Sequence, residues 1–422
     1  MLLIYSYLIN IFFPIIVFLI FVRKLLSKED KNRYREKIFS SSLNIVKNHK
    51  KKLIWFHTAS IGELKSIIPL IKELNKKDEL EFLVTTVTVS SANLIKKELF
   101  NQNNIYHRFF PIDKPSLIKK FLNGWSPFMT IFVDSEIWPN FILEIKKRNI
   151  PLILLNGRIT KKTFLKWSIF KNVAQKVFRS FDLCLTSSNE SKKYLEKLKA
   201  KNVKYIGNLK FTSENEINNQ DIKNKKILNN NKFWCAVSTH KEEDIFCIKT
   251  HLEIKKNHKN IISIIIPRHI NRAQSIKSSC EKLNLKSQIL SYGEFIEPNK
   301  EIIIINSYGV TSSYLSFCKS VFIGKSMIKR LQSVGGQNPI EAAKLGCKIY
   351  YGPYVYNFQE MYELLNKFQI SEIIYNEIEL SNKISADLNN KEKIKDEKIK
   401  IINDLGKQIL NDTYLELNKM IN

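Results

Sequence analysis

The sequence predicts two α/β domains, each built on a parallel β-sheet with helices on both faces, preceded by one apolar helix. Its 422 residues exceed what one ordinary hydrophobic core accommodates and suffice for two domains. From Lys51 onward, short runs of β-forming residues alternate with amphipathic helical stretches, which is the pattern of strand–helix–strand units. A polar, Asn-rich stretch at 212–231 interrupts this alternation, and we expect the linker between the domains there.

Each predicted domain contains several strand and helix pairs. In the first domain the expected strands are 51–58, 81–88, 129–135 and 150–156, with helices at 63–75, 90–100 and 139–148. In the second domain the expected strands are 233–239, 260–267, 301–306, 320–324 and 347–352, with helices beginning near 242, 271, 311 and 339. We therefore place the first domain at 24–215, the linker at 216–231, the second domain at 232–380 and a helical tail at 381–422.

The first segment of the chain is apolar. Residues 2–22 carry no charge, and about 20 apolar residues suffice for a helix to cross the hydrocarbon core. A cleaved signal peptide is the alternative, but no basic stretch precedes the apolar run and no AxA-like site follows it. We expect a retained membrane anchor at 1–23 that forms a single span. The basic residues after it favour a cytoplasmic location for the domains and can bind anionic lipid head groups: Arg23, Lys24, Lys28, Lys31, Arg33, Arg35 and Lys37.

The chain is strongly basic, because 68 Lys and Arg against 40 Asp and Glu give a formal net charge of +28. This charge favours anionic partners such as nucleic acid, anionic lipid or phosphorylated substrates without choosing among them. A general enrichment in Lys, Ile and Asn is the alternative explanation, since Lys recurs along the whole chain. The six cysteines are dispersed, with no CxxC pair and no His at metal-ligand spacing, so we expect buried, reduced thiols and no metal site.

Polar motifs follow the predicted strands of the first domain, at the edge where parallel sheets bind ligands. Glu63 in HTASIGE is our candidate general base, since a desolvated carboxylate has a raised pKa; complementing the helix dipole is the alternative. Glu136 in SEIWPN either faces the ligand or caps the helix that Pro139 begins. Lys210 in GNLKF either presents a cation to the ligand or lies on the surface.

The second domain has a comparable set of motifs. Arg268 in PRH follows a predicted strand and is our candidate phosphate ligand, with a surface salt bridge as the alternative. The glycines at 335–336 predict a tight turn ahead of Asn338, which can cap a helix that Pro339 begins, and the N-terminus of such a helix favours a phosphate. Glu341 in the first turn of this helix is placed to accept hydrogen bonds from ribose hydroxyls.

Taken in this order, the elements HxxSxGE, ExWPN, NxR, GNLKF, STH, PRH and GGxNxxE resemble those of the 3-deoxy-D-manno-octulosonic acid (Kdo) transferases that act on lipid A. The resemblance runs from the apolar segment to about Leu364. It implies a GT-B fold, with two Rossmann-like domains facing a cleft, in an inner-membrane enzyme whose catalytic domains are cytoplasmic. It also implies an inverting, metal-independent transfer of Kdo from CMP-Kdo to a lipid A precursor (lipid IVA) in lipopolysaccharide core biosynthesis, with no cofactor.

The resemblance also implies roles for individual residues. Glu63 acts as the general base, while Glu136 and Lys210 stabilise the transition state. CMP is held by the residues that match the donor motifs of the family: Pro267, Arg268, Tyr308, Gly309, Val310, Asn338 and Glu341. The pattern is altered at three positions, where the family has His at the first and acidic residues at the other two: Gln337, Asn306 and Val310.

Two other functions are compatible with parts of the sequence. A GT-B transferase that uses a UDP- or GDP-sugar has the same architecture, and competition by CMP against UMP separates the two. A membrane-tethered nucleic-acid-binding protein fits the net charge and the Tyr and Phe residues interleaved with Lys. It requires a basic stripe, which the sequence lacks, so we expect no nucleic-acid partner.

Overall fold

The computed structural model describes residues 2–39, 50–99, 102–213, 224–390 and 396–422. The chain divides into two compact units, which are described separately: unit 1 comprises Met1–Glu214 and Leu405–Asn422, and unit 2 comprises Asn215–Asp404. The last helix, α16 (Asp396–Ile421), contributes its second part to unit 1. Residues 216–223 of the predicted linker lie outside the described residues, and helix α9 (Lys225–Asn230) occupies most of the remainder.

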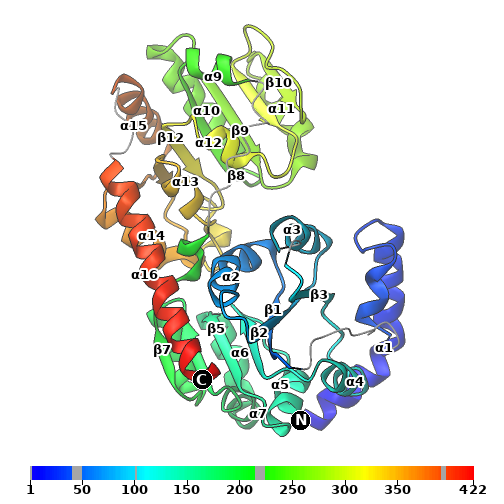
Figure 1. Cartoon of the computed structure of the whole chain (residues 1–422). Coiled ribbons are helices and arrows are strands. Elements are labelled where there is room, and N and C mark those ends of the chain that lie inside the picture. The colour runs from blue at the N-terminus through cyan, green and yellow to red at the C-terminus, as the bar shows by residue number, and fades with distance from the viewer. Residues whose placement is uncertain (1, 40–49, 100–101, 214–223, 391–395) are drawn as a thin grey trace. The chain divides into compact units, whose positions relative to one another are not determined.

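Unit 1 contains a seven-stranded, entirely parallel sheet with the strand order β3-β2-β1-β4-β5-β6-β7 (Figure 1). Its strands are β1 (Lys52–Thr58), β2 (Leu80–Thr86), β3 (Ile105–Phe109), β4 (Met129–Val133), β5 (Leu152–Gly157), β6 (Leu183–Thr186) and β7 (Val203–Tyr205). Its helices before α16 are α1 (Leu2–Leu25), η1 (Arg33–Lys37), α2 (Ile61–Leu74), α3 (Val89–Leu99), α4 (Pro115–Trp125), α5 (Pro139–Lys147), α6 (Lys161–Ile169), α7 (Lys171–Phe178), α8 (Asn189–Lys197) and the short η3 (Leu209–Thr212).

Unit 2 also has a seven-stranded parallel sheet, in the order β10-β11-β9-β8-β12-β13-β14. Its strands are β8 (Phe233–Thr239), β9 (Ile262–Pro267), β10 (Ser287–Leu290), β11 (Ile302–Ile305), β12 (Ser320–Ile323), β13 (Lys348–Tyr351) and β14 (Ser371–Ile373). Its helices after α9 are α10 (Glu243–Asn257), η5 (Ile270–Arg272), α11 (Ala273–Glu281), α12 (Thr311–Leu315), η6 (Lys329–Leu331), α13 (Ile340–Lys344), η7 (Tyr356–Phe358), α14 (Gln359–Lys367) and α15 (Glu377–Asn389).

Both sheets are covered on both faces. β2, β4 and β5 are buried at every residue, and because successive side chains of a strand point to opposite faces, neither face meets solvent. The central strands are therefore continuous apolar runs, such as ISIIIP in β9 and IIII in β11. In unit 1 the core gathers large aromatic rings around Trp55, including Phe121, Phe132 and Phe141. The prediction of two parallel α/β sheets is confirmed.

The strands that the sequence pattern did not reveal are mostly edge strands. β3, β7, β10 and β14 occupy the four sheet edges, and each is short and partly exposed. An edge strand has a neighbour on one side only, so it needs no continuous apolar run. β6 is internal, but its four residues, LCLT, are too few for a period to be recognised.

Helix α1 is long and apolar enough to cross a membrane, and no other helix of the described residues meets both criteria. A signal sequence has the same length and composition. One side of α1 packs along unit 1 beside α5 (Figure 1), where Tyr5 donates a hydrogen bond to Asp113 and Ile20 packs against Tyr34. The other side exposes large apolar side chains: Leu3, Ile4, Tyr7, Leu8, Ile11, Phe12, Ile15, Phe18, Leu19, Phe21 and Leu25.

The packing of α16 in unit 1 gives a first prediction. A Cβ atom at Gly406 would lie 2.3 Å from the backbone oxygen of Phe211, in the turn that carries Lys210. Replacing Gly by Ala normally stabilises a helix by about 1 kcal/mol, but here either α16 or the turn must move. We expect Gly406→Ala to lower the free energy of unfolding by about 1–3 kcal/mol, measured by thermal and denaturant unfolding.

The matched control is Asn411→Ala, at an exposed position of the same helix. Because Ala has the higher helix propensity, this variant should unfold at the wild-type temperature or slightly above it. A Gly406→Ala protein as stable as the control would contradict the close approach of α16 to the turn.

Candidate active site

The candidate catalytic residues of unit 1 lie where the strand order reverses. β1 lies between β2 and β4 in the sheet. The connection from β1 to β2 and the connection from β4 to β5 therefore run toward opposite edges of the sheet. Ligands of parallel sheets bind at such a position. Glu63 follows β1, whereas Asp134 and Glu136 follow β4.

Glu63 is fixed by reciprocal hydrogen bonds at the start of α2. Ser60 Oγ accepts the N–H of Glu63 at 3.3 Å, while the Glu63 carboxylate accepts the N–H of Ala59 at 2.7 Å and the Ser60 hydroxyl at 2.8 Å. This is a variant of the capping box, because the Glu63 carboxylate accepts the N–H of Ala59, the residue before the N-cap Ser60. Burial, followed by the negative charge of Asp134, raises the pKa of Glu63 to about 7. The half-buried side chain therefore caps its helix and is also able to accept a proton near neutral pH.

Glu136 is held by His57 and Trp138. Its carboxylate accepts the Trp138 indole N–H at 2.8 Å and lies 3.3 Å from His57 Nε2. Burial lowers the pKa of His57, so its ring is neutral at neutral pH. His57 Nδ1 lies 3.0 Å from the Thr85 hydroxyl, and when it accepts this hydroxyl, Nε2–H donates to Glu136. Burial opposes ionisation of the carboxyl, but the hydrogen bonds from His57 and Trp138 outweigh it and lower the pKa of Glu136.

Lys210 is paired with a carboxylate that the motifs did not single out. Its Nζ lies 3.2 Å from Asp134 Oδ2, and both side chains are largely buried. Asp134 has a φ of +63°, which Asp tolerates better than most residues. Asn208 and Asn156 hold the turn that carries Lys210, because their side chains accept the N–H groups of Lys210 and Leu209. The one signal for Asp134 in the sequence is its position directly after a buried strand.

The group that caps α5 is Asp113, and Glu136 does not fill this role. Asp113 is 1% exposed and accepts the N–H groups of Asn140 at 3.1 Å and Phe141 at 2.9 Å. Trp138 occupies the N-cap position and makes no side-chain cap bond. Asp113 lies after β3, far from α5 in the sequence, so no local pattern indicates it. The Glu136 carboxylate is thereby left to its contacts with the His57 and Trp138 rings.

In unit 2 the loops after β8 and β12 meet at the equivalent edge of the sheet. Glu243 is 1% exposed, and its carboxylate joins these loops. It accepts four backbone N–H groups at 2.6–3.0 Å, those of His240, Lys325, Ser326 and Met327. The Ser326 hydroxyl extends the link, because it accepts a backbone N–H from the loop after β13 at 2.9 Å. One buried carboxylate therefore orders most of this edge.

Cationic side chains gather around His240 at this edge. Burial, followed by nearby positive charge, lowers the pKa of His240 to about 4. In order of effect, the charged neighbours are Lys325, His269, Arg272 and Arg268. The His240 and His269 rings lie 5.9 Å apart. This cluster suits the binding of an anion such as a phosphate. The sequence motifs predicted Arg268 as a phosphate ligand but did not indicate Lys325.

Pro267 ends β9, and Arg268 follows it at the same edge. The N–H of Arg268 donates to the carbonyl of Thr239 at 3.0 Å, which joins the ends of β9 and β8. The Arg268 residue is exposed, so its guanidinium is accessible from solvent. Arg272 forms an ion pair with Asp244.

Glu341 and the loop before α12 are brought together. Glu341 lies in the first turn of α13, and its carboxylate accepts the hydroxyl of Ser312, in the first turn of α12. In the loop that leads to α12, Tyr308 is exposed, Gly309 has a φ of +82° and Val310 is buried. A buried Val310 side chain offers no polar group to a ligand.

The turn before α13 places Asn338 beside the start of that helix. Asn338 Oδ1 accepts the N–H of Ile340 at 3.1 Å, although Pro339 and not Asn338 occupies the N-cap position. Gly336 has a φ of +89°, and its N–H donates to the carbonyl of Lys325 at 2.7 Å. The turn is therefore tied to the loop after β12, which carries part of the cationic cluster.

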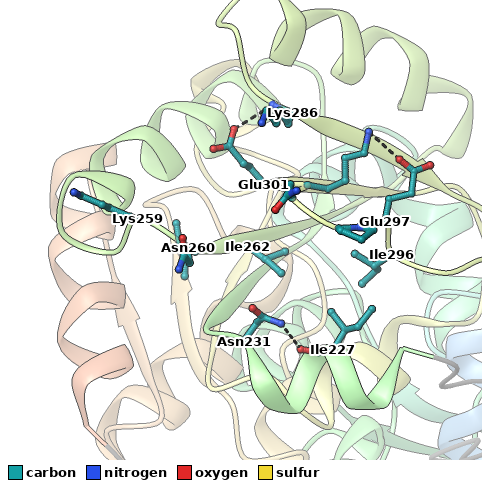
Figure 2. Close-up of a pocket in the computed structure, with 13 residues that line it drawn as sticks. Ile227, Asn231, Lys259, Asn260, Ile262, Lys286, Ile296, Glu297 and Glu301 are labelled. Carbon is teal, nitrogen blue, oxygen red and sulfur yellow. Dashed lines mark hydrogen bonds and ion pairs between the residues drawn. The ribbon is translucent and has the colours of Figure 1, made fainter.

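A cavity of about 580 Å³ lies at the opposite, amino edge of the unit 2 sheet (Figure 2). Its lining includes residues that precede or begin strands, among them Ile262, Lys286 and Glu301. Two of its carboxylates have partners within the lining: Glu301 accepts the backbone N–H of Lys286 at 3.1 Å, and Glu297 forms an ion pair with Lys300 at 2.9 Å. Because parallel sheets bind ligands at the carboxyl edge, we do not place the active site here.

Known proteins similar to this chain identify its family. Residues 32–213 match the family described as 3-Deoxy-D-manno-octulosonic-acid transferase (kdotransferase). A 3-deoxy-D-manno-octulosonic acid transferase of Rickettsia bellii is 31% identical over 352 residues, which cover 83% of this chain and 82% of the relative. The chain belongs to the Kdo transferase family. It is therefore a glycosyltransferase, and the resemblance drawn from its motifs is confirmed.

A Kdo transferase of Rickettsia prowazekii is 27% identical over 99% of both chains. Among solved structures, UDP-GlcNAc 2-epimerase from Neisseria meningitidis aligns with a TM-score of 0.53 at 14% identity, covering 87% of this chain and all of that one (100%). This likeness concerns the fold alone, and it confirms the predicted GT-B class. The family match spans the three residues predicted to be catalytic, Glu63, Glu136 and Lys210. Their roles, and those of the predicted donor residues, stay predictions.

The charge of Asp134 gives a pH prediction for this Kdo transferase. A base acts only when ionised, and the pKa of Glu63 is about 7, so transfer should rise with pH through this value. Asp134→Asn removes a negative charge that raises the pKa of Glu63. We therefore expect the acidic limb of the kcat/KM profile to move to lower pH in this variant, whatever the change in maximal rate.

The control is Asp78→Asn, which removes the same charge at an exposed position before β2 and should leave the limb in place. An acidic limb at the wild-type pH in Asp134→Asn would show that another group titrates.

Proposed function

We propose that this chain transfers Kdo from CMP-Kdo to a lipid A precursor such as lipid IVA, in lipopolysaccharide core biosynthesis, with inversion at the anomeric carbon. The Kdo transferase family supports the sugar and the reaction class. The observation that carries the mechanism is Glu63, a half-buried carboxylate whose pKa is raised to about 7 beside Asp134. A pKa near the working pH is what a general base requires.

In the proposed reaction Glu63 takes the proton from a glucosamine hydroxyl of the acceptor. The hydroxyl oxygen forms a bond to the anomeric carbon of Kdo while the bond from this carbon to the CMP phosphate oxygen breaks, and the electron pair leaves with CMP. The two events take place on opposite faces of the carbon, so the configuration inverts in one step. The Glu136 carboxylate would stabilise positive charge at this carbon, and Lys210 would balance negative charge on the leaving group.

The carboxyl edge of unit 2 supplies the proposed donor site. Arg268 and Lys325, in the cationic cluster around His240, would bind the CMP phosphate. The backbone of the 308–310 loop and Asn338 would contact the nucleotide, and Glu341, which accepts the Ser312 hydroxyl in this structure, would accept a ribose hydroxyl. Side chains can neutralise a monophosphate leaving group, so we propose that the transfer needs neither a metal nor a cofactor.

We also propose that α1 attaches the enzyme to the inner membrane, with the two units on the cytoplasmic side. Its exposed apolar side and the basic residues Arg23 and Lys24 in its last turn support this location. The contacts of Tyr5 and Ile20 place α1 against unit 1 over about 22 Å, so its outer side remains for lipid. The single span predicted from the sequence stays a prediction, and it requires α1 to separate from Asp113.

The test of the reaction is transfer from CMP-Kdo to a tetra-acylated lipid A precursor by membranes that contain the wild type, Glu63→Ala or Glu79→Ala. Glu79 is exposed and lies at the amino end of β2, so Glu79→Ala is the matched control. We expect Glu63→Ala to lower the rate by about 10²–10⁴-fold, the contribution of a general base. CMP binding should survive, because the donor residues lie in unit 2. A Glu63→Ala enzyme with the rate of the control would eliminate Glu63 as the base.

The same assay identifies the nucleotide and the role of metals. CMP should inhibit the transfer and UMP should not, whereas preferential inhibition by UMP would indicate a UDP-sugar donor. Chelators should leave the rate unchanged. A strict divalent-metal requirement would overturn the metal-independent mechanism.

The proposed anchor gives a separate prediction. Phe12 and Phe18 are 49% and 63% exposed on the outer side of α1, so replacing both by Asp should shift the protein from the membrane to the soluble fraction. The matched control replaces two apolar residues of unit 2, Tyr375 and Ile378, which are 62% and 59% exposed, by Asp and should leave the distribution unchanged. Flotation with anionic vesicles measures both, and equal flotation of the two variants would contradict the proposed lipid contact.

A further inference from the structure

Helix α1 is joined to the start of α5 by partly buried hydrogen bonds. The Tyr5 hydroxyl donates to Asp113 Oδ2 at 2.8 Å, and the Ser6 hydroxyl donates to Asn140 Oδ1 at 2.6 Å. Asp113 accepts the N–H groups of Asn140 and Phe141, and Asn140 Nδ2 donates to the Asp113 carbonyl at 2.7 Å. Asp113 is 1% exposed and Asn140 is 7% exposed, so water does not readily replace these bonds.

α5 begins directly after Trp138, one of the two residues that hold Glu136. Trp138, at the N-cap of α5, donates to Glu136, and its ring centroid lies 5.3 Å from that of Phe110. Phe110 stacks at 3.6 Å on His57, the second partner of Glu136. The loop at 110–114 therefore touches the neighbours of Glu136 through Phe110 and touches α1 through Asp113.

Apolar contacts hold the same loop against the middle of α1. Ile112 packs on the cluster formed by Ile20, Tyr34 and Ile38. Lys114 Nζ lies 3.7 Å from the centroid of the Phe13 ring. Attachment to a membrane requires none of these contacts. In particular, it does not require the hydrogen bond from the Tyr5 hydroxyl to the buried Asp113 carboxylate.

We propose that Tyr5 is a positioning residue for Glu136: through Asp113 and the start of α5, helix α1 holds the loop that carries Glu136. The inference rests on the proposed function, in which Glu136 stabilises the transition state. It makes the membrane helix a part of the support of the active site as well as an attachment. If α1 dissociates from unit 1, the enzyme should lose turnover, while the donor site in unit 2 stays intact.

The test compares two variants of the full-length enzyme that make the same chemical change on the same helix. Tyr5→Phe removes the hydroxyl that Asp113 accepts, and Tyr7→Phe removes a hydroxyl from a side chain that is 68% exposed. We expect Tyr5→Phe to lower kcat by about three- to tenfold, the effect of one hydrogen bond, with the KM for CMP-Kdo unchanged. Tyr7→Phe should match the wild type.

A double-variant cycle shows whether the effect passes through Glu136. In a Glu136→Gln background, Tyr5→Phe should lower the residual kcat much less than it does in the wild type, because residues that act as one unit are not additive. Full additivity would overturn the inference. A Tyr5→Phe enzyme with the kcat of Tyr7→Phe would overturn it as well.

Hydrogen exchange tests the positioning without a transfer assay. The backbone N–H groups of Asn140 and Phe141 donate hydrogen bonds to Asp113, so they should exchange faster in Tyr5→Phe than in the wild type. In Tyr7→Phe they should exchange at the wild-type rate. Absence of Kdo transfer by the wild type would refute the proposed function, and hydrogen exchange would still decide the role of Tyr5. Equal exchange in the two variants would refute that role.

Discussion

Carboxylates that accept backbone N–H groups hold the loops on which the candidate site depends. Asp113 accepts two at the start of α5, and Glu243 accepts four from the loops after β8 and β12. These donors have no partner within a helix or a strand, and hydrogen bonds to a charged acceptor are stronger than neutral ones. Asp113 and Glu243 each join segments that follow different strands, so the carboxyl edge of each sheet is fixed as a unit.

The two units present opposite electrostatic environments at these edges. In unit 1, burial and the charge of Asp134 raise the pKa of Glu63, whereas in unit 2 burial and neighbouring cations lower the pKa of His240. One edge therefore favours the uptake of a proton, and the other favours the binding of an anion. The proposed transfer deprotonates a hydroxyl and releases CMP, so it would use both properties, each on the sheet of a different unit.

Helix α1 differs on its two sides, and the polar residues within its apolar sequence mark the difference. Tyr5 and Ser6 are polar residues of this mostly apolar helix that point to unit 1, where they meet Asp113 and Asn140. The opposite side is apolar and exposed along the helix. Under the proposed attachment, lipid contact would constrain one side of α1, and the geometry of the loop before α5 would constrain the other.

The sequence by itself determined the features that rest on local chemistry. Buried parallel strands must be continuous apolar runs, and Glu63 follows such a run at the start of a helix, so the central strands and the position of Glu63 were readable. The tertiary structure decided what depends on contacts between distant segments. The edge strands lack such runs, and the pairing of Asp134 with Lys210 joins residues that follow β4 and β7, two strands that are not neighbours in the sheet. The partners of Asp113 and Glu243 likewise lie beside them only because the sheet brings the loops after different strands to one edge.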